Sequence, residues 1–276
     1  MTPTEQLLRA ERSREGMWLF LGATDTGKTT LISALASRLV GEHRVAIVDA
    51  DIGQSHIGPP TTVGWALMEE GRTDLTECEP AGMVFVGDVT PVGHLLQLTT
   101  ALALGVHAAS AAAQIVLIDT PGLVTGPAAS ALWWTAERLL RPWRIVAIRR
   151  SDELAPILAG LPRGTHHADL IEAAQGIAGK SPEQRRTYRR QQFARYFRDA
   201  QLHEIDLGKV AIRTAGPARA NAPTGCLAGL ANAEGIDLAV GVIESYEPSR
   251  QTMRIRAPAL DPKLIRCVTI GTPYPD

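Results

Sequence analysis

The chain has 276 residues and a formal net charge of −1, from 28 basic and 29 acidic side chains. Hydrophobic residues make up 45% and charged residues 21%, which excludes global disorder and allows a sizeable core. The total charge gives no sign of a nucleic-acid partner, which would have to appear as a local basic patch.

Short apolar runs alternate with helical patterns after a charged, helix-prone lead-in at residues 5–15. The runs carry almost no charge, which is typical of parallel strands buried on both faces, and the segments between them are long enough for crossover helices. This alternation predicts a doubly wound, mainly parallel α/β sheet. The expected strands are 17–21, 45–48, 84–86, 115–118 and 145–148, and the expected helices are 29–40, 95–113 and 128–140.

The pattern changes after Ser181 and Pro182, where residues 183–200 form an arginine-rich segment with helical periodicity. From about Asp206 onward, short apolar runs are separated by Gly, Pro and Asn turns, which predicts a small all-β module. Its expected strands are 209–213, 226–231, 238–246, 252–256 and 267–270.

Cysteine usage and hydropathy favour a cytoplasmic protein. The three cysteines, Cys78, Cys226 and Cys267, have neither metal-ligand nor disulfide-framework spacing, as expected in a reducing compartment. The first residues lack a basic region followed by an apolar run, so we expect no signal peptide. The longest apolar stretch, 95–118, is interrupted by polar side chains and predicts a buried helix feeding a strand instead of a membrane span.

Residues 22–29 match the Walker A motif G-x-x-x-x-G-K-[ST]. The motif follows an apolar strand and opens a helix, which phosphate binding requires because backbone N–H groups and the helix N-terminus then face one anion. Lys28 is expected to reach the β- and γ-phosphates and the Thr29 hydroxyl to bind Mg²⁺. This loop predicts an ATP or GTP site contacted by Gly22, Ala23, Thr24, Asp25, Thr26, Gly27, Lys28, Thr29 and Thr30.

Acidic residues end two of the expected strands, at the sheet edge that borders the ligand crevice in open α/β folds. After strand 45–48, one of the two carboxylates Asp49 and Asp51 could hold Mg²⁺ directly or through water, while the other could accept a proton from an attacking hydroxyl that Gln54 positions. Asp119 ends a Walker B-like strand and is a candidate to hold the metal ion through water. The alternative for each aspartate is a purely structural role, such as capping the following turn.

The arginine-rich segment contains six arginines between positions 185 and 198. Arg185 and Arg189 are four residues apart and share one helix face. We expect this pair to form a lid that offsets the negative charge of the transferring γ-phosphoryl group, while Arg186 and Arg190 hold nucleic-acid phosphates. The alternative is a solvated helix face without a ligand.

Together these motifs resemble the P-loop polynucleotide 5′-hydroxyl kinases related to the RNA kinases of eukaryotic tRNA splicing and ribosomal RNA processing. The resemblance covers roughly residues 16–273, with gaps. It includes the phosphate loop, the D-x-x-Q motif at 51–54, the R-x-x-x-R lid pattern at 185–189 and the aromatic pair Tyr196–Phe197. It implies that Asp51 is the general base that acts on the 5′-hydroxyl.

Two further segments are similar to family features. Residues 86–94 resemble the substrate clasp, which implies substrate contacts by Thr90, Pro91 and His94, although this chain lacks the asparagine that relatives place near positions 93 and 94. A lone histidine such as His94 is equally typical of a core or surface position. Residues 227–235, 239–243 and 254–258 resemble the glycine-marked strands of the family's C-terminal β-domain.

The resemblance implies an enzyme that transfers the γ-phosphate of ATP, or of GTP as an alternative, to the 5′-hydroxyl of single-stranded or end-exposed RNA or DNA with Mg²⁺. It implies no membrane partner, and a compact form without the N-terminal β-domain of the larger eukaryotic members. The expected division is a lead-in at 1–16, a P-loop kinase domain at 17–205 with its lid at about 181–200, and the β module at 206–276.

The main alternative is a regulatory P-loop ATPase or GTPase without transferase activity. The carboxylates at 49, 51 and 119 would suit that class too. However, Ala23 stands where partitioning-type ATPases have a lysine, and the chain has no N-K-x-D motif for guanine recognition. A small-metabolite kinase is a third possibility, but it would not require the arginine cluster.

Overall fold

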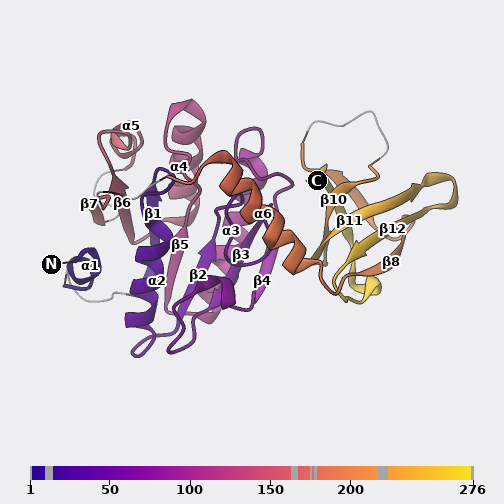
Figure 1. Cartoon of the computed structure of the whole chain (residues 1–276), viewed down its shortest axis with the longest axis horizontal. Helices are drawn as coiled ribbons and strands as arrows, with labels where there is room; N and C mark the ends of the chain where they lie inside the picture. Colours follow the sequence, from indigo (N-terminus) through magenta and orange to yellow (C-terminus); the bar gives the residue numbers. More distant parts are fainter. Residues whose placement is uncertain are drawn as a thin grey trace.

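A computed structural model describes residues 2–9, 15–162, 167–174, 176, 179–216 and 223–274. An α/β body occupies one end of the molecule and a group of antiparallel strands the other, and the long helix α6 (Pro182–Tyr196) lies across the junction (Figure 1). The expected mixed α/β fold class is confirmed.

Five parallel strands form the centre of the body, in the order β7-β6-β1-β5-β2. They are β1 (Gly16–Gly22), β2 (Val45–Asp49), β5 (Ile115–Asp119), β6 (Arg144–Arg149) and β7 (His167–Glu172). The strands β2 and β5 are buried along their whole length, because helices cover both faces of the sheet. The strand β7 was not predicted, since it pairs with β6 alone and its sequence mixes polar and apolar residues.

Two antiparallel strands continue the sheet beyond β2. They are β3 (Thr62–Leu67) and β4 (Gly82–Phe85), joined by a segment with the 3-10 helix η1 (Leu75–Glu77). The strand β3 lies between β2 and β4 and is antiparallel to both. The strand β4 therefore runs in the same direction as β2, as expected, but does not pair with it. Sequence reasoning missed β3, which contains Gly64; a Cβ there would lie 2.1 Å from the carbonyl oxygen of Ile57.

Helices cover the two faces of the sheet and enclose separate apolar cores. The helices α3 (Leu95–Ala112) and α4 (Gly126–Leu140) bury residues such as Leu102 and Trp133 on one face, and α2 (Lys28–Leu39) buries Ile32 and Leu35 on the other. Among the described residues, α3 alone is long and apolar enough to cross a membrane, but it packs on β2, β3, β4 and β5. The short helices are α1 (Pro3–Arg9) and α5 (Ala155–Ala159); of the predicted lead-in, residues 10–14 lie outside the described residues.

The C-terminal strands are joined to the edge of the body. The β4–β11 contact is a single pair, Asp237 with Met83, and it makes one continuous sheet of the thirteen described strands, so the domain boundary near residue 206 stays a prediction. The strand β8 follows α6 directly and was not predicted. The elements are β8 (Gln201–Asp206), β9 (Ala211–Thr214), β10 (Cys226–Ala231), β11 (Asp237–Glu247), η2 (Pro248–Arg250), β12 (Thr252–Ala257), η3 (Pro262–Leu264) and β13 (Cys267–Pro273).

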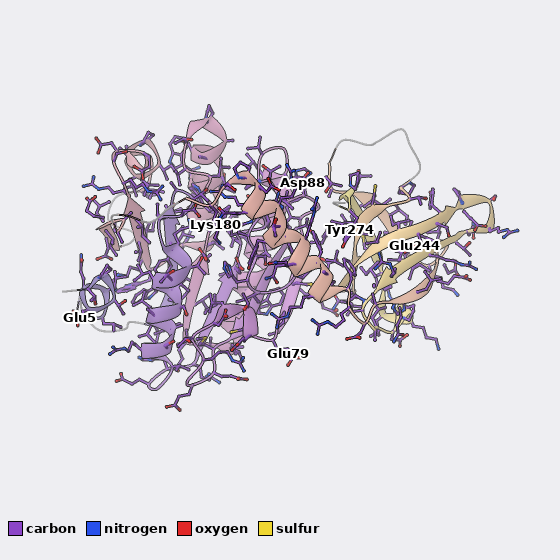
Figure 2. The ribbon with its side chains drawn as sticks, viewed as in Figure 1. Glu5, Glu79, Asp88, Lys180, Glu244 and Tyr274 are labelled. Carbon is purple, nitrogen blue, oxygen red and sulfur yellow. The ribbon has the colours of Figure 1, made fainter. Side chains whose placement is uncertain are left out.

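Helix α6 begins at a capping box and ends in an aromatic cluster. Ser181 accepts a hydrogen bond from the backbone N–H of Gln184, whose side chain accepts one from the N–H of Ser181. At the other end, the rings of Phe193 and Phe197 pack against Tyr274, which lies between α6 and the C-terminal strands (Figure 2). One end of α6 is therefore fixed to the C-terminal strands while its first turns extend over the body.

Candidate active site

The phosphate loop links the buried strand β1 to helix α2. Gly27, with φ of 89°, has a left-handed conformation that glycine adopts without strain, and it directly precedes the helix. The Thr26 hydroxyl donates to the carbonyl oxygen of Ala23 at 2.9 Å, which closes the loop on itself. Lys28 Nζ donates to the carbonyl oxygens of Gly22 and Ala23 at 2.9 and 3.0 Å, so its ammonium group lies at the loop.

Thr29 and Asp119 meet at the end of β5. The Thr29 hydroxyl donates to Asp119 Oδ2 at 2.5 Å, while the buried Oδ1 of Asp119 has no hydrogen-bond partner in the described part of the chain. An unsatisfied carboxylate oxygen beside a loop hydroxyl fits a hydrated Mg²⁺ ion, which takes few protein ligands and keeps several waters. Within the described residues there is no group of three or more His, Cys, Asp or Glu side chains that could hold a metal ion.

Asp49 holds the turn that follows β2. Its Oδ2 accepts hydrogen bonds from the backbone N–H groups of His56 and Ile57, at 2.5 and 3.1 Å, and its Oδ1 accepts one from Asp51 at 3.0 Å. Burial, and then repulsion from Asp119, raise the pKa of this carboxyl group well above its usual range. These contacts match the alternative role of Asp49 as a structural residue that caps the following turn. Thr29 and Asp119 fit the metal ion better than Asp49 does.

Asp51 lies at the mouth of the same turn, with Gln54 behind it. Oδ1 of Asp51 accepts hydrogen bonds from the N–H groups of Gly53 and Gln54, and no described residue donates to Oδ2. Burial raises the pKa of Asp51 to about 6, the charge of Asp119 adds to the shift, and Lys28 opposes it. A carboxylate with one free oxygen and a pKa close to neutrality is suited to general-base catalysis.

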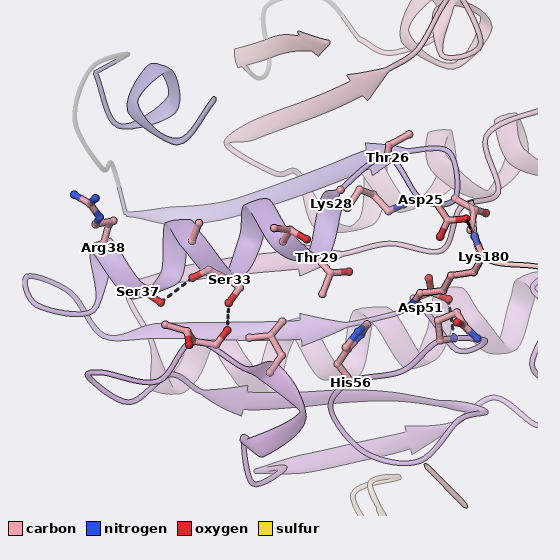
Figure 3. A pocket seen from close by; sticks show the side chains of 17 residues that line it. Asp25, Thr26, Lys28, Thr29, Ser33, Ser37, Arg38, Asp51, His56 and Lys180 are labelled. Atoms are coloured by element: carbon pink, nitrogen blue, oxygen red, sulfur yellow. Dashed lines mark hydrogen bonds between the residues drawn. The ribbon is translucent and has the colours of Figure 1, made fainter. Parts of the chain in front are cut away.

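Asp51, Gln54 and residues 24–30 of the phosphate loop line one cavity of about 700 Å³, which extends from the phosphate loop along α2 (Figure 3). In the close-up, Lys28, Asp51, His56 and Lys180 gather at its loop end, and Ser33, Ser37 and Arg38 continue along the helix. The structure therefore brings the phosphate loop and the D-x-x-Q turn to the same cavity. Its lining residues are Thr24, Asp25, Thr26, Gly27, Lys28, Thr29, Thr30, Ser33, Ala34, Ser37, Arg38, Asp51, Gln54, His56, Thr73, Leu75 and Lys180.

The first turns of helix α6 contact two residues of the lining of this cavity, Asp25 and Gln54. A guanidinium nitrogen of Arg185 lies 2.7 Å from Asp25 Oδ2 in the phosphate loop. Gln54 Nε2 donates to the backbone oxygen of Arg185 at 3.4 Å, and the Tyr188 hydroxyl donates to the backbone oxygen of Ser55 at 2.9 Å. The buried atoms Arg185 Nε and Gln54 Oε1 have no hydrogen-bond partner in the described part of the chain.

The expected substrate residues, and Arg189 of the expected lid pair, lie away from the nucleotide cavity. Arg186, Arg189 and Arg190 line a second cavity instead of the first. His94 is buried where α3 begins, next to Gly216, where an added Cβ would lie 3.1 Å from its Nε2. Thr90 is exposed and Pro91 is partly exposed, on the loop between β4 and α3.

Sequence reasoning missed two basic residues beside the loop. Arg150, directly after β6, donates to the backbone oxygens of Thr24 and Asp25 at 3.2 and 2.6 Å. The backbone N–H of Lys180 donates to Asp25 Oδ2 at 3.0 Å. The position of Arg150 at the carboxyl end of a predicted strand is the signal that could have revealed it, since the same rule identified Asp49 and Asp119.

The fold and this site define a P-loop nucleotide-binding protein. The family model described as "mRNA cleavage and polyadenylation factor CLP1 P-loop" matches residues 22–199. The chain belongs to this family.

Several curated archaeal proteins resemble the chain. The polyribonucleotide 5′-hydroxyl-kinase of Pyrococcus abyssi is 31% identical over 215 residues, which cover 76% of this chain and 60% of that protein. The Pyrococcus furiosus protein of the same description is 33% identical over 213 residues, covering 76% of this chain and 58% of its own length. The chain thus spans about 60% of the length of the curated relatives that it matches.

The fold is also similar to a solved structure, that of the wild-type Clp1p–Pcf11p complex. The TM-score is 0.67 at 12% sequence identity, and the match covers 96% of this chain and 76% of the solved one. At this identity the likeness supports the fold alone.

Proposed function

We propose that this chain transfers the γ-phosphate of ATP to the 5′-hydroxyl end of a polynucleotide, RNA or DNA. The observation that carries the proposal is the shared cavity of the phosphate loop, Asp51 and Gln54, whose lining residues Asp25 and Gln54 are contacted by Arg185 of the lid. A kinase needs a nucleotide site and a general base within reach of one acceptor hydroxyl. The curated relatives described as polyribonucleotide 5′-hydroxyl-kinases add independent support.

The residues divide the work in the following way. Asp51 takes the proton of the 5′-hydroxyl on its free oxygen, and Gln54 orients that hydroxyl. Lys28 and Arg185 balance the charge that develops around the transferring group, which is the main source of catalysis in phosphoryl transfer. Thr29 and Asp119 would hold Mg²⁺, which when bound neutralises phosphate charge.

The direct test supplies ATP labelled at the γ-phosphate, with Mg²⁺ and matched RNA and DNA oligonucleotides that carry free 5′-hydroxyls. We expect label on the oligonucleotide with the unaltered protein and none with Lys28→Ala. The same reactions with labelled GTP establish the nucleotide preference. An absence of label on every oligonucleotide, with ATP binding demonstrated separately, contradicts the proposal.

ATP hydrolysis without an oligonucleotide is the companion measurement. Hydrolysis as fast as phosphate transfer would favour the regulatory ATPase over the kinase. We expect hydrolysis to be slow in comparison, because Asp51 and Gln54 are arranged for an acceptor hydroxyl at the cavity.

A further inference from the structure

A lysine at the base of the lid helix lines the nucleotide cavity. Lys180 directly precedes Ser181, the N-cap of α6, and its side chain forms part of the cavity wall. In the close-up, Lys180 lies at the loop end of the cavity, between Asp25 of the phosphate loop and Asp51 of the D-x-x-Q turn (Figure 3). The lid segment therefore brings an ammonium group to the place where these two parts of the site meet.

Contacts with the phosphate loop and with the lid fix the position of this lysine. Its backbone N–H donates to Asp25 Oδ2 at 3.0 Å, which joins the segment before α6 to the loop. Its ammonium nitrogen lies 5.2 Å from the centroid of the Tyr188 ring, a distance typical of a cation–π contact. The Tyr188 hydroxyl donates to the backbone oxygen of Ser55 at 2.9 Å. The aromatic ring that carries the ammonium is thus itself held against the turn after β2.

The cations around the phosphate loop differ in how their donors are occupied. Lys28 and Arg150 each donate to two backbone oxygens of the loop, and Arg185 pairs with a loop carboxylate. Within the described residues, the Lys180 ammonium has an aromatic partner but no hydrogen-bond acceptor. An aromatic face leaves the N–H donors of an ammonium available, and a phosphate oxygen is a stronger partner for them. Lys180 can therefore bind an anion without losing a hydrogen bond to the described part of the chain.

The charge of Lys180 acts on other groups in the cavity. His56 lines the same cavity, and its ring lies 5.8 Å from that of Tyr188, centroid to centroid. Burial lowers the pKa of His56, Asp119 opposes this shift, and the charge of Lys180 adds to it. The ammonium is therefore close enough to the interior of the cavity to act on a bound ligand.

The geometry of a Walker A loop decides which phosphate group meets this lysine. Backbone N–H groups of the loop surround the α- and β-phosphates, and the γ-phosphate extends beyond them toward the acceptor. In this chain Asp51 marks the acceptor side, and Lys180 lies between it and the loop. The terminal group of a diphosphate stays within the loop, so the position of Lys180 fits the terminal group of a triphosphate.

We propose that the Lys180 ammonium binds the γ-phosphate of a nucleoside triphosphate and makes the site discriminate between a triphosphate and a diphosphate. The proposal deepens the donor half of the proposed function and rests on it for the use of that phosphate, although its test requires nucleotide binding alone. Because Lys180 belongs to the segment that begins α6, this contact links the γ-phosphate to the docking of the lid on the loop. The diphosphate that remains after transfer lacks the contact, which favours its release.

The test measures the Kd of ADP and of the non-hydrolysable triphosphate β,γ-imido-ATP, both with Mg²⁺, by isothermal titration calorimetry. We expect Lys180→Gln to weaken binding of the triphosphate by at least about ten-fold and that of ADP by less than about two-fold, as the loss of one charge-assisted hydrogen bond predicts. Lys180→Arg keeps the charge and should keep most of the discrimination. The matched control is Lys209→Gln, the same replacement at a lysine that is 81% exposed between β8 and β9, and it should leave both Kd values unchanged.

Two results overturn the proposal. Equal weakening of both nucleotides by Lys180→Gln would show that the lysine supplies only general positive charge to the cavity, and unchanged Kd values would show that it does not contact the nucleotide. The proposed function is tested separately. A loss of discrimination in Lys180→Gln supports the γ-phosphate contact even where no oligonucleotide accepts label, and that absence of label contradicts the proposed function alone.

Discussion

The two sides of the proposed reaction centre, the nucleotide donor side and the hydroxyl acceptor side, are built in different ways. On the donor side, residues 22–30 are consecutive in sequence and form the loop itself, which Asp119, Arg150 and Arg185 contact from other parts of the chain. On the acceptor side, the D-x-x-Q turn, the loop after β4, helix α6 and strand β13 come from four distant parts of the chain. A phosphate loop needs only local backbone geometry, whereas a polynucleotide site requires surfaces that tertiary packing brings together.

The largest expected effect on kcat is that of replacing Asp51, which lies between the two proposed sides. Asp51→Asn should lower kcat by at least about one hundred-fold with little change in ATP affinity, because general-base catalysis contributes that much. In the unaltered protein the base works when deprotonated, so kcat/KM should rise with pH through about 6 and then level off. Initial rates of the variant and of the unaltered protein, measured from about pH 5 to 8, test the loss of kcat and the pH dependence of kcat/KM. A kcat/KM that is independent of pH below about 6 would exclude Asp51 as the base.

Arg185 should show the next largest effect, on the donor side. Arg185→Ala is expected to lower kcat by at least about ten-fold while the Kd for ATP changes little, as for a contact made mainly in the transition state. Arg189→Ala should instead raise the oligonucleotide KM, because Arg189 lines the second cavity. Steady-state kinetics separate the two variants. An unchanged kcat in Arg185→Ala, together with an unchanged oligonucleotide KM in Arg189→Ala, would reduce the lid to a solvated helix.

A smaller effect is expected where α6 is anchored to the C-terminal strands. Tyr196→Phe removes the hydroxyl that accepts from the Val240 N–H, which should lower the free energy of unfolding by about 1–3 kcal/mol. It should also raise the oligonucleotide KM and leave the ATP KM unchanged. Thermal unfolding measures the loss of stability, and steady-state kinetics measure the two KM values. Tyr246→Phe, in the same group of strands, is the control. Equal changes in both KM values would indicate a general loss of structure.

The smallest effect concerns the junction between the α/β body and the C-terminal strands. Asp237 accepts a hydrogen bond from the Phe85 N–H at 2.7 Å, and burial raises its pKa to about 7. Because the pKa is higher in the folded state, this carboxyl stabilises the fold at low pH, and that contribution is lost as pH rises from about 4 to about 7. Asp237→Asn should therefore raise Tm more at pH 8 than at pH 5. A gain independent of pH would contradict this account.

The body of the fold could be predicted where strands are buried on both faces. The strands around 17–21, 45–48, 115–118 and 145–148 are apolar throughout, because helices cover each side of them. The strands β3, β7 and β8 could not be predicted in this way. In β8 burial alternates, and β7 is an edge strand, so neither has the continuous apolar signal.

By itself, the sequence determined the donor side of the site. The spacing of Gly22, Gly27, Lys28 and Thr29 specifies a loop whose backbone N–H groups converge, and that geometry is local. It also placed Asp51 and Asp119 at strand ends, since the carboxyl ends of parallel strands share one edge of a sheet.

Only the tertiary structure decided how the acceptor side is assembled. It separated Arg185, at the phosphate loop, from Arg189, in a cavity closed by the C-terminal strands. It also showed that Asp49 is occupied by the N–H groups of its own turn. The physical reason is that the places of Arg185 and Arg189 depend on the packing of α6 against the body and the C-terminal strands, and this packing joins segments whose separation in sequence carries no information about their distance in space.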